Sequence, residues 1–326
     1  MVGTLGAQSS SAWVTDRALA RSADLLIQLQ PGIQRRGLSN SWVSLLGVLI
    51  QRVSQRRRLD RSILPTLHDR LGVLLWQAED YESALKNFES ARLLARAGKL
   101  LHLEASAWLG ICLVHWAKGN PKEASKIIKP VYNTFARRDR RDSIEIRLLA
   151  ALGLISFSRG HYSTAEKHFR NALGVGNFDD KTIRAQLCVG RGLCLQMLGR
   201  LPAALRQYGL AAHSLANDQG ARREFAHIDL LRSSAFFQAG DLANAQAALE
   251  RATRQVPFQG EIAARAFFES GMGRIYMQTG KSKKAASLFK SAAKLWRRTG
   301  KPSMALNASG LIASTGRPDV RGLDLV

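Results

Sequence analysis

The sequence predicts an all-α protein, an α-solenoid of about six helical hairpins with capping helices at both ends. The main observation is a repeat: alanines recur at Ala84, Ala124, Ala165, Ala204, Ala245 and Ala285, with spacings of 40, 41, 39, 41 and 40 residues. A steady period of this length is typical of stacked helical units. Hydrophobic residues make up 46% of the 326 residues, which is enough for a sizeable core. No segment keeps the period-two alternation of a strand.

The spacing inside each repeat explains why it forms a hairpin. A large apolar residue follows the central alanine by four positions, as Phe88 follows Ala84, so both lie on one helical face. The alanine lets a neighbouring helix approach closely, and the large residue fills the gap between helices. In five of the six units a glycine stands five residues before the alanine, where one helix must end before the next begins. Glu79 takes that place in the first unit.

The flanking segments predict caps. Residues 1–10 are interpreted as a disordered lead and residues 11–64 as a capping hairpin, with helices over 12–30 and 39–58. Residues 65–301 hold the six repeats, and residues 302–326 form a closing helix and a tail.

The repeat resembles the tetratricopeptide repeat over about Pro65 to Lys301, although its units have about 40 residues instead of the usual 34. Long units of this kind are similar to those of bacterial signalling regulators and peptide-sensing receptors. The resemblance implies one continuous right-handed superhelix. Cys112 and Ser233 replace the small Gly or Ala of the family, so we expect looser packing in their units. Arg191 and Arg232 stand where the family usually has Leu; they either form a cationic pocket or pair with an acid such as Asp229.

The resemblance also implies which residues line the concave face: those at eight, eleven and fifteen positions before each central alanine. They form an apolar ladder, and its candidate partner-binding residues are Trp76, Leu109, Leu113, Trp116, Leu154, Phe157, Leu193, Phe237 and Met277. Either the ladder lines a groove for an apolar or amphipathic segment of a partner, or it is buried as core. A Lys, Asn and Arg clamp for a C-terminal carboxylate is missing, because Asp69, Leu109, Ala150 and Val189 occupy those places.

The net charge is strongly positive, with 48 Lys and Arg against 25 Asp and Glu, or +23. One helical stripe gathers the basic residues Lys283, Lys290, Lys294, Arg297 and Lys301. Such a surface attracts nucleic acid or an acidic protein, or it is simply a solvated face.

The sequence contains no recognisable catalytic motif. Thr279-Gly280-Lys281-Ser282 looks like the end of a phosphate-binding loop, but Ile275 stands where that motif needs a glycine. His161 and His168 have no acidic or Cys partner for a metal site. We expect no enzyme activity, no cofactor and no metal. The three cysteines form no C-x-x-C pair, which favours the reducing cytoplasm, and no apolar run is long enough to span a membrane.

These observations predict a non-enzymatic interaction scaffold or adaptor that binds an apolar or helical segment of a protein partner in the concave groove, as one subunit of a larger complex. One alternative is a nucleic-acid-associated regulator that uses the basic stripe. Another is a module that senses a ligand or peptide.

Overall fold

The computed structural model describes residues 21–22, 39–55, 62–136, 143–175, 180–216, 218, 220–255, 262–298, 306 and 308–309. All regular structure within these ranges is helical, which confirms the prediction of an all-α helical repeat solenoid. The chain divides into two compact units, Met1–Gly176 (unit 1) and Asn177–Val326 (unit 2). The division falls inside the predicted repeat region, after the third hairpin. Each unit is described by itself below.

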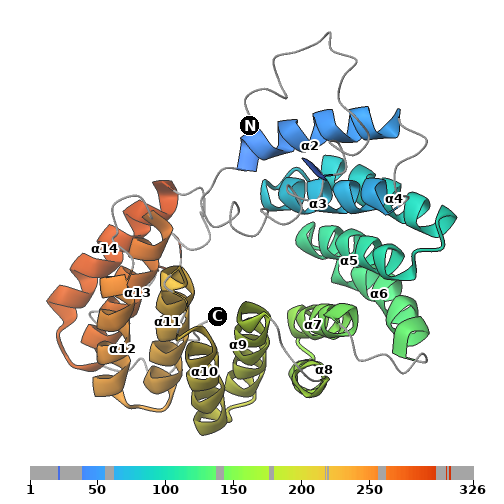
Figure 1. Ribbon diagram of the computed structural model, residues 1–326. Coiled ribbons are helices and arrows are strands. Elements are labelled where there is room, and N and C mark those ends of the chain that lie inside the picture. The colour runs from blue at the N-terminus through green and yellow to red at the C-terminus, as the bar shows by residue number, and fades with distance from the viewer. Residues whose placement is uncertain are drawn as a thin grey trace. The chain divides into compact units, whose positions relative to one another are not determined.

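The described part of unit 1 contains three hairpins, and α2 precedes them (Figure 1). Its helices are α2 (Ser39–Ser54), α3 (Ile63–Gln77), α4 (Tyr81–Ala97), α5 (Leu101–Ala117), α6 (Pro121–Ala136), α7 (Ser143–Ser158) and α8 (Tyr162–Gly174). Helix α3 pairs with α4, α5 with α6 and α7 with α8, and α2 packs on α3. Leu46, Leu49 and Val53 of α2 are buried against Leu67 and Leu71 of α3, so α2 closes the apolar end of the first hairpin.

Unit 2 repeats this plan. Its helices are α9 (Lys181–Met197), α10 (Leu201–Leu215), α11 (Arg222–Gln238), α12 (Leu242–Gln255), α13 (Ile262–Gln278) and α14 (Ser282–Arg298). They pair as α9 with α10, α11 with α12 and α13 with α14. Outside the described residues lie the predicted disordered lead, Lys301, most of the closing helix over 302–314, and all of the capping helix over 12–30 except Arg21 and Ser22, which are helical.

The turns inside the hairpins have the conformation that the repeat predicts. Gly119, Gly160, Gly199, Gly240 and Gly280 have φ between 72° and 78°. Glu79, at the same position in the first hairpin, has φ of 63°. Side chains crowd their own backbone at positive φ, so glycine is the least strained residue here. The first hairpin therefore makes the same turn at a conformational cost that the other five avoid.

The six central alanines are fully buried, and the helices interlock around them. In four hairpins a glycine twelve residues before the alanine faces an aromatic ring four residues after it. A Cβ on Gly153 would lie 2.8 Å from Cζ of Phe169, and one on Gly273 would lie 2.6 Å from Cε1 of Phe289. Because glycine has no side chain, the aromatic ring four residues after the alanine can pack directly against the first helix.

The other two hairpins fill the same space differently. Cys112 and Ser233 replace the glycine, and the aliphatic Ile128 and Leu249 replace the ring. The Cys112 thiol donates to the Ala124 carbonyl at 3.4 Å, and the Ser233 hydroxyl donates to the Ala245 carbonyl at 2.8 Å. Both residues are buried. The looser packing expected in these units is thus offset by a smaller partner and a hydrogen bond.

Candidate functional site

The residues of the predicted ladder lie on the first helix of each hairpin: α3, α5 and α7 in unit 1, and α9, α11 and α13 in unit 2. Eight of the nine candidates are partly buried, namely Trp76, Leu113, Trp116, Leu154, Phe157, Leu193, Phe237 and Met277. Leu109 of α5 differs, because only 3% of its surface is exposed and it belongs to the core cluster that α5 forms with α6 and α7. The ladder is thus neither plain core nor a freely solvated surface.

In unit 1 the aromatic residues of the ladder are held by specific contacts. The Trp116 indole N–H of α5 donates to Ser158 Oγ of α7 at 3.2 Å. The rings of Phe157 and Tyr162 pack in a tilted arrangement with centroids 5.3 Å apart. Trp76 packs on the cluster that contains Leu74 and Leu75. Each aromatic residue is therefore positioned by its own unit while part of it stays accessible.

A polar network links the first helices of unit 1, and the sequence reasoning did not predict it. The Ser106 hydroxyl of α5 donates to the Asp69 carboxylate of α3, with oxygen distances of 3.2 and 3.3 Å, and Arg147 of α7 donates to Ser106 Oγ at 3.4 Å. Burial raises the pKa of Asp69 despite the nearby charges of Arg147 and Arg70. Burial likewise lowers the pKa of Arg147, although Asp69 opposes that shift. The signal available in the sequence was an acid and a Ser at inward positions of successive repeats.

Unit 2 has a second buried network. The Tyr208 hydroxyl donates to Gln196 Oε1 at 2.8 Å, and Gln196 Nε2 donates to Ser234 Oγ at 2.9 Å. Tyr208 is fully buried and Gln196 is 8% exposed. Gln196 therefore occupies a ladder position as a buried hydrogen-bonding residue that joins α9 to α11.

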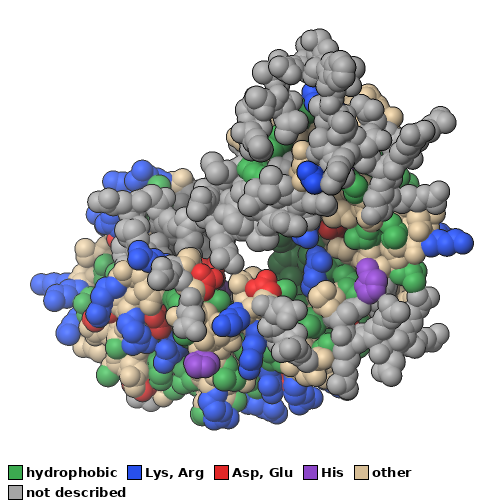
Figure 2. Space-filling model, in the orientation of Figure 1, with side chains coloured by type: hydrophobic (Ala, Val, Ile, Leu, Met, Phe, Trp, Pro, Cys, Tyr) green, Lys and Arg blue, Asp and Glu red, His purple; other side chains and the backbone are tan. Residues whose placement is uncertain are grey.

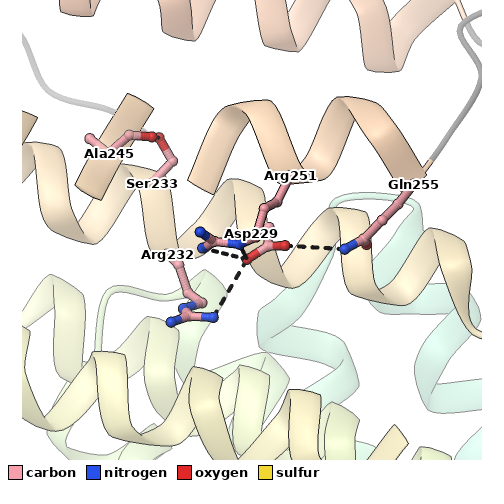
Figure 3. A network of polar contacts seen from close by, with 6 residues as sticks. All are labelled: Asp229, Arg232, Ser233, Ala245, Arg251 and Gln255. Carbon is pink, nitrogen blue, oxygen red and sulfur yellow. Dashed lines mark hydrogen bonds and ion pairs between the residues drawn. The ribbon is translucent and has the colours of Figure 1, made fainter. Parts of the chain in front are cut away.

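The alternative of acid pairing for Arg232 is confirmed (Figure 3). Asp229, which is 6% exposed, accepts from Arg251 Nη2 at 3.1 Å and from Gln255 Nε2 at 3.3 Å, and Arg232 Nη1 lies 3.6 Å from the same carboxylate. Three side chains from α11 and α12 thus surround one buried carboxylate. This network joins the two helices of a hairpin and pairs Arg232 with an acid.

The basic stripe lies on α14. Lys283, Lys290, Lys294 and Arg297 are exposed, and α14 contains no acidic residue. Arg297 donates to Ser309 Oγ at 3.5 Å. Figure 2 shows Lys and Arg side chains gathered on the surface of unit 2 around α12 to α14. On the opposite face of α14, Phe289 and Trp296 are buried, so α14 is strongly amphipathic.

Comparison with known proteins agrees with this architecture. Residues 70–127 match the tetratricopeptide repeat family, and a search of curated proteins found no match. Three solved structures share the fold. The Cut9-Hcn1 hetero-tetramer of the APC/C is 14% identical with a TM-score of 0.64, over 95% of this chain and 50% of that one. The Rap conjugation gene regulator of plasmid pLS20, in complex with the Phr* peptide, is 14% identical with a TM-score of 0.63, over 96% and 83%. A tetratricopeptide repeat protein from Parabacteroides merdae is 18% identical with a TM-score of 0.52, over 88% and 100%.

The solved structures extend the helical repeat fold beyond the residues that match the family. The chain spans half the length of the Cut9-Hcn1 structure. Among the described helices, none is long and apolar enough to cross a membrane.

Proposed function

We propose that this protein is a non-enzymatic scaffold that binds an apolar or amphipathic helical segment of a partner protein, as one subunit of a larger complex. The observation that carries the proposal is the row of partly buried aromatic side chains on the first helices of unit 1. Trp116 is held by Ser158, and Phe157 is held by Tyr162. Aromatic anchors that are already fixed in place lose little side-chain entropy when a partner binds.

The size of the expected effect follows from the chemistry of such anchors. Removing a buried aromatic anchor from an interface costs about 2 kcal/mol or more, which is roughly a 30-fold loss in affinity. Exposed leucines elsewhere on the molecule should have no comparable effect. Leu93 on α4 is 57% exposed and Leu210 on α10 is 45% exposed, and both lie on second helices. They provide matched controls for the loss of apolar surface.

The test is a selection followed by measurement. A displayed library of 16-residue peptides is selected against the full chain, and the affinity of the enriched peptides is measured by isothermal titration calorimetry. We expect apolar residues at helical spacing in the enriched peptides, and an affinity that falls at least tenfold in the Trp116→Ala/Phe157→Ala variant but not in Leu93→Ala/Leu210→Ala. Circular dichroism checks that both variants keep their helicity. Equal loss in both variants, or no loss in either, would refute the groove.

We place this scaffold in the cytoplasm. Cys112, Cys188 and Cys194 are all buried and form no disulfide, which is the usual state in a reducing compartment. The proposal assigns no catalytic step to the chain.

A second candidate function uses the exposed basic stripe of α14 to bind nucleic acid. Binding of that kind weakens steeply with salt because neutralised phosphates release counterions. Replacing Lys290 and Lys294 by Gln should then lower both the affinity for a duplex and the salt slope. An affinity that does not change between about 50 and 200 mM salt would refute this candidate.

A further inference from the structure

We propose that the basic stripe of α14 lies on the phosphate backbone of a nucleic acid duplex and binds it without reading its base sequence. This inference deepens the second candidate function and rests on it: it names the form of the nucleic acid and the part of it that is contacted. The described residues of the stripe are Lys283, Lys290, Lys294 and Arg297, and all four are exposed.

The charges of the stripe are not neutralised within the described part of the protein. On α6, by contrast, the exposed Lys126 has an acid one turn away, and its Nζ lies 3.0 Å from Glu123 Oε2. Helix α14 contains no acidic residue, and among the described residues none of the four cations of the stripe forms a salt bridge. Like charges four residues apart, such as those of Lys290 and Lys294, destabilise a helix. A polyanion along the stripe would relieve this repulsion.

The four cations form a straight row. Lys290, Lys294 and Arg297 stand seven, eleven and fourteen residues after Lys283, so all four fall within about 60° around the helix. At a rise of about 1.5 Å per residue, the row is about 21 Å long. This length exceeds the width of either groove of B-DNA, about 12 Å and about 6 Å. The row can therefore contact phosphates of both strands across a groove, and only a duplex offers that arrangement.

The surface of α14 lacks what single-strand binding uses. Proteins that bind single strands gain affinity by stacking bases on aromatic side chains. The aromatic residues of α14 are Phe289 and Trp296, which are 0% and 5% exposed and belong to the core. A flexible single strand would have to be ordered along the row without any gain from stacking. A duplex is already stiff over this length, so it loses less conformational freedom.

The side chains of the stripe suit phosphates better than base edges. Bases are read mainly by the paired hydrogen bonds of Arg, Asn and Gln, and α14 contains no Asn or Gln. Its Arg297 donates to Ser309 Oγ at 3.5 Å. The other three cations are lysines, which act as point charges, and the exposed Ser287 between them adds a hydroxyl that can donate to a phosphate. We therefore expect no preference for a base sequence.

An anionic membrane is the main competing partner for a basic helix. Amphipathic helices of that kind bind by burying their apolar face among the lipids. In α14 the apolar face is already covered, because Ala285, Phe289, Leu295 and Trp296 are buried in the protein. What remains available is one row of charges, which matches rows of phosphates more closely than a flat lipid surface.

The test measures the affinity of the full chain for two duplexes of unrelated sequence, each about 24 base pairs long, and for a single strand with the same number of phosphates. Fluorescence anisotropy should show equal affinities for the two duplexes, within about twofold, and an affinity for the single strand at least about fivefold weaker. Four phosphate contacts predict that the affinity for a duplex falls about 150-fold between about 50 and 200 mM salt. In Lys290→Gln/Lys294→Gln two contacts remain, so the fall should be only about 12-fold.

Lys122→Gln/Lys126→Gln is the control, because both lysines are exposed on α6 and the variant loses the same net charge. It should keep the salt dependence of the unchanged protein, and circular dichroism checks that both variants fold. A stronger preference between the two duplexes, a single strand that binds as tightly as a duplex, or an equal effect of the control variant overturns the proposal while nucleic acid binding stands. Tighter binding to vesicles of anionic lipid than to the duplex also overturns it. If no nucleic acid binds at about 50 mM salt, the second candidate function fails and this inference fails with it.

Discussion

The exchange of a glycine and an aromatic ring for a serine and a leucine can be tested in one hairpin. In α7 and α8, a Cβ on Gly153 would lie 2.8 to 2.9 Å from three ring carbons of Phe169, which is only 6% exposed. The Ser233 and Leu249 pair of unit 2 fills the equivalent space without this conflict. We therefore expect Gly153→Ser and Phe169→Leu to be destabilising separately and to compensate each other when combined.

The magnitudes follow from packing. Gly153→Ser forces the ring out of place, and overpacking of this kind costs about 1–3 kcal/mol. Phe169→Leu loses buried apolar surface and leaves space, at about 1–2 kcal/mol. In the double variant the smaller leucine accommodates the serine, and the serine hydroxyl can reach the Ala165 carbonyl. We expect a coupling of about 1–3 kcal/mol in favour of the pair.

The assay is equilibrium unfolding in urea, monitored by tryptophan fluorescence. Five of the six tryptophans, at positions 13, 42, 76, 108 and 116, fall within unit 1, so the signal reports mainly the unit that carries the substitutions. Gly47→Ser in α2 is the control for introducing a serine, because a Cβ there meets nothing within 4 Å. If the two single costs add to within about 0.5 kcal/mol in the double variant, the proposed complementarity is wrong.

Three further predictions concern single positions. Glu79 has φ of 63°, so Glu79→Gly should relieve backbone strain and raise the melting temperature. Gly199 has φ of 72°, so Gly199→Ala should lower the free energy of unfolding by about 1–2 kcal/mol. A lower melting temperature for Glu79→Gly would contradict the strain at this turn. Because burial raises the pKa of Asp69 above its ordinary 3.8, the folded state binds the extra proton, so stability falls as pH rises from 3.8 through the raised pKa. Asp69→Asn should remove that part of the pH dependence in urea titrations at successive pH values, and an unchanged profile would exclude Asp69 as its source. Burial raises the pKa of the Cys112 thiol to about 12, so iodoacetamide at pH 8 should not modify Cys112 in the folded protein; rapid labelling seen by mass spectrometry would show that the site opens.

The repeat itself could be predicted from sequence because each rule is local. A positive φ at a turn requires glycine or costs energy, so the glycines five residues before the alanines marked the ends of the first helices. The alanines and the large residues four positions later marked the buried face, and all of them are buried. The ladder could likewise be assigned to the first helices by register alone.

Which polar side chains are buried, and which partners they have, depends on residues that are distant in the chain. Only the tertiary structure shows these partners. Asp69, Ser106 and Arg147 come together across 78 residues, and the inward positions of the acid and the serine do not by themselves specify that these three side chains pair. For Arg232 the sequence offered Asp229, three residues away, as a partner, but it did not predict that Arg251 and Gln255 from the next helix hold the same carboxylate.

The sequence by itself determined that the protein is a stack of helical hairpins, where each turn falls and which helix faces bury alanine. Only the tertiary structure decided that Leu109 is core while Trp116 stays partly accessible. The physical reason is that backbone strain and helical periodicity act over a few residues. Exposure and hydrogen-bond partners, by contrast, are set by neighbouring helices whose packing the period does not specify.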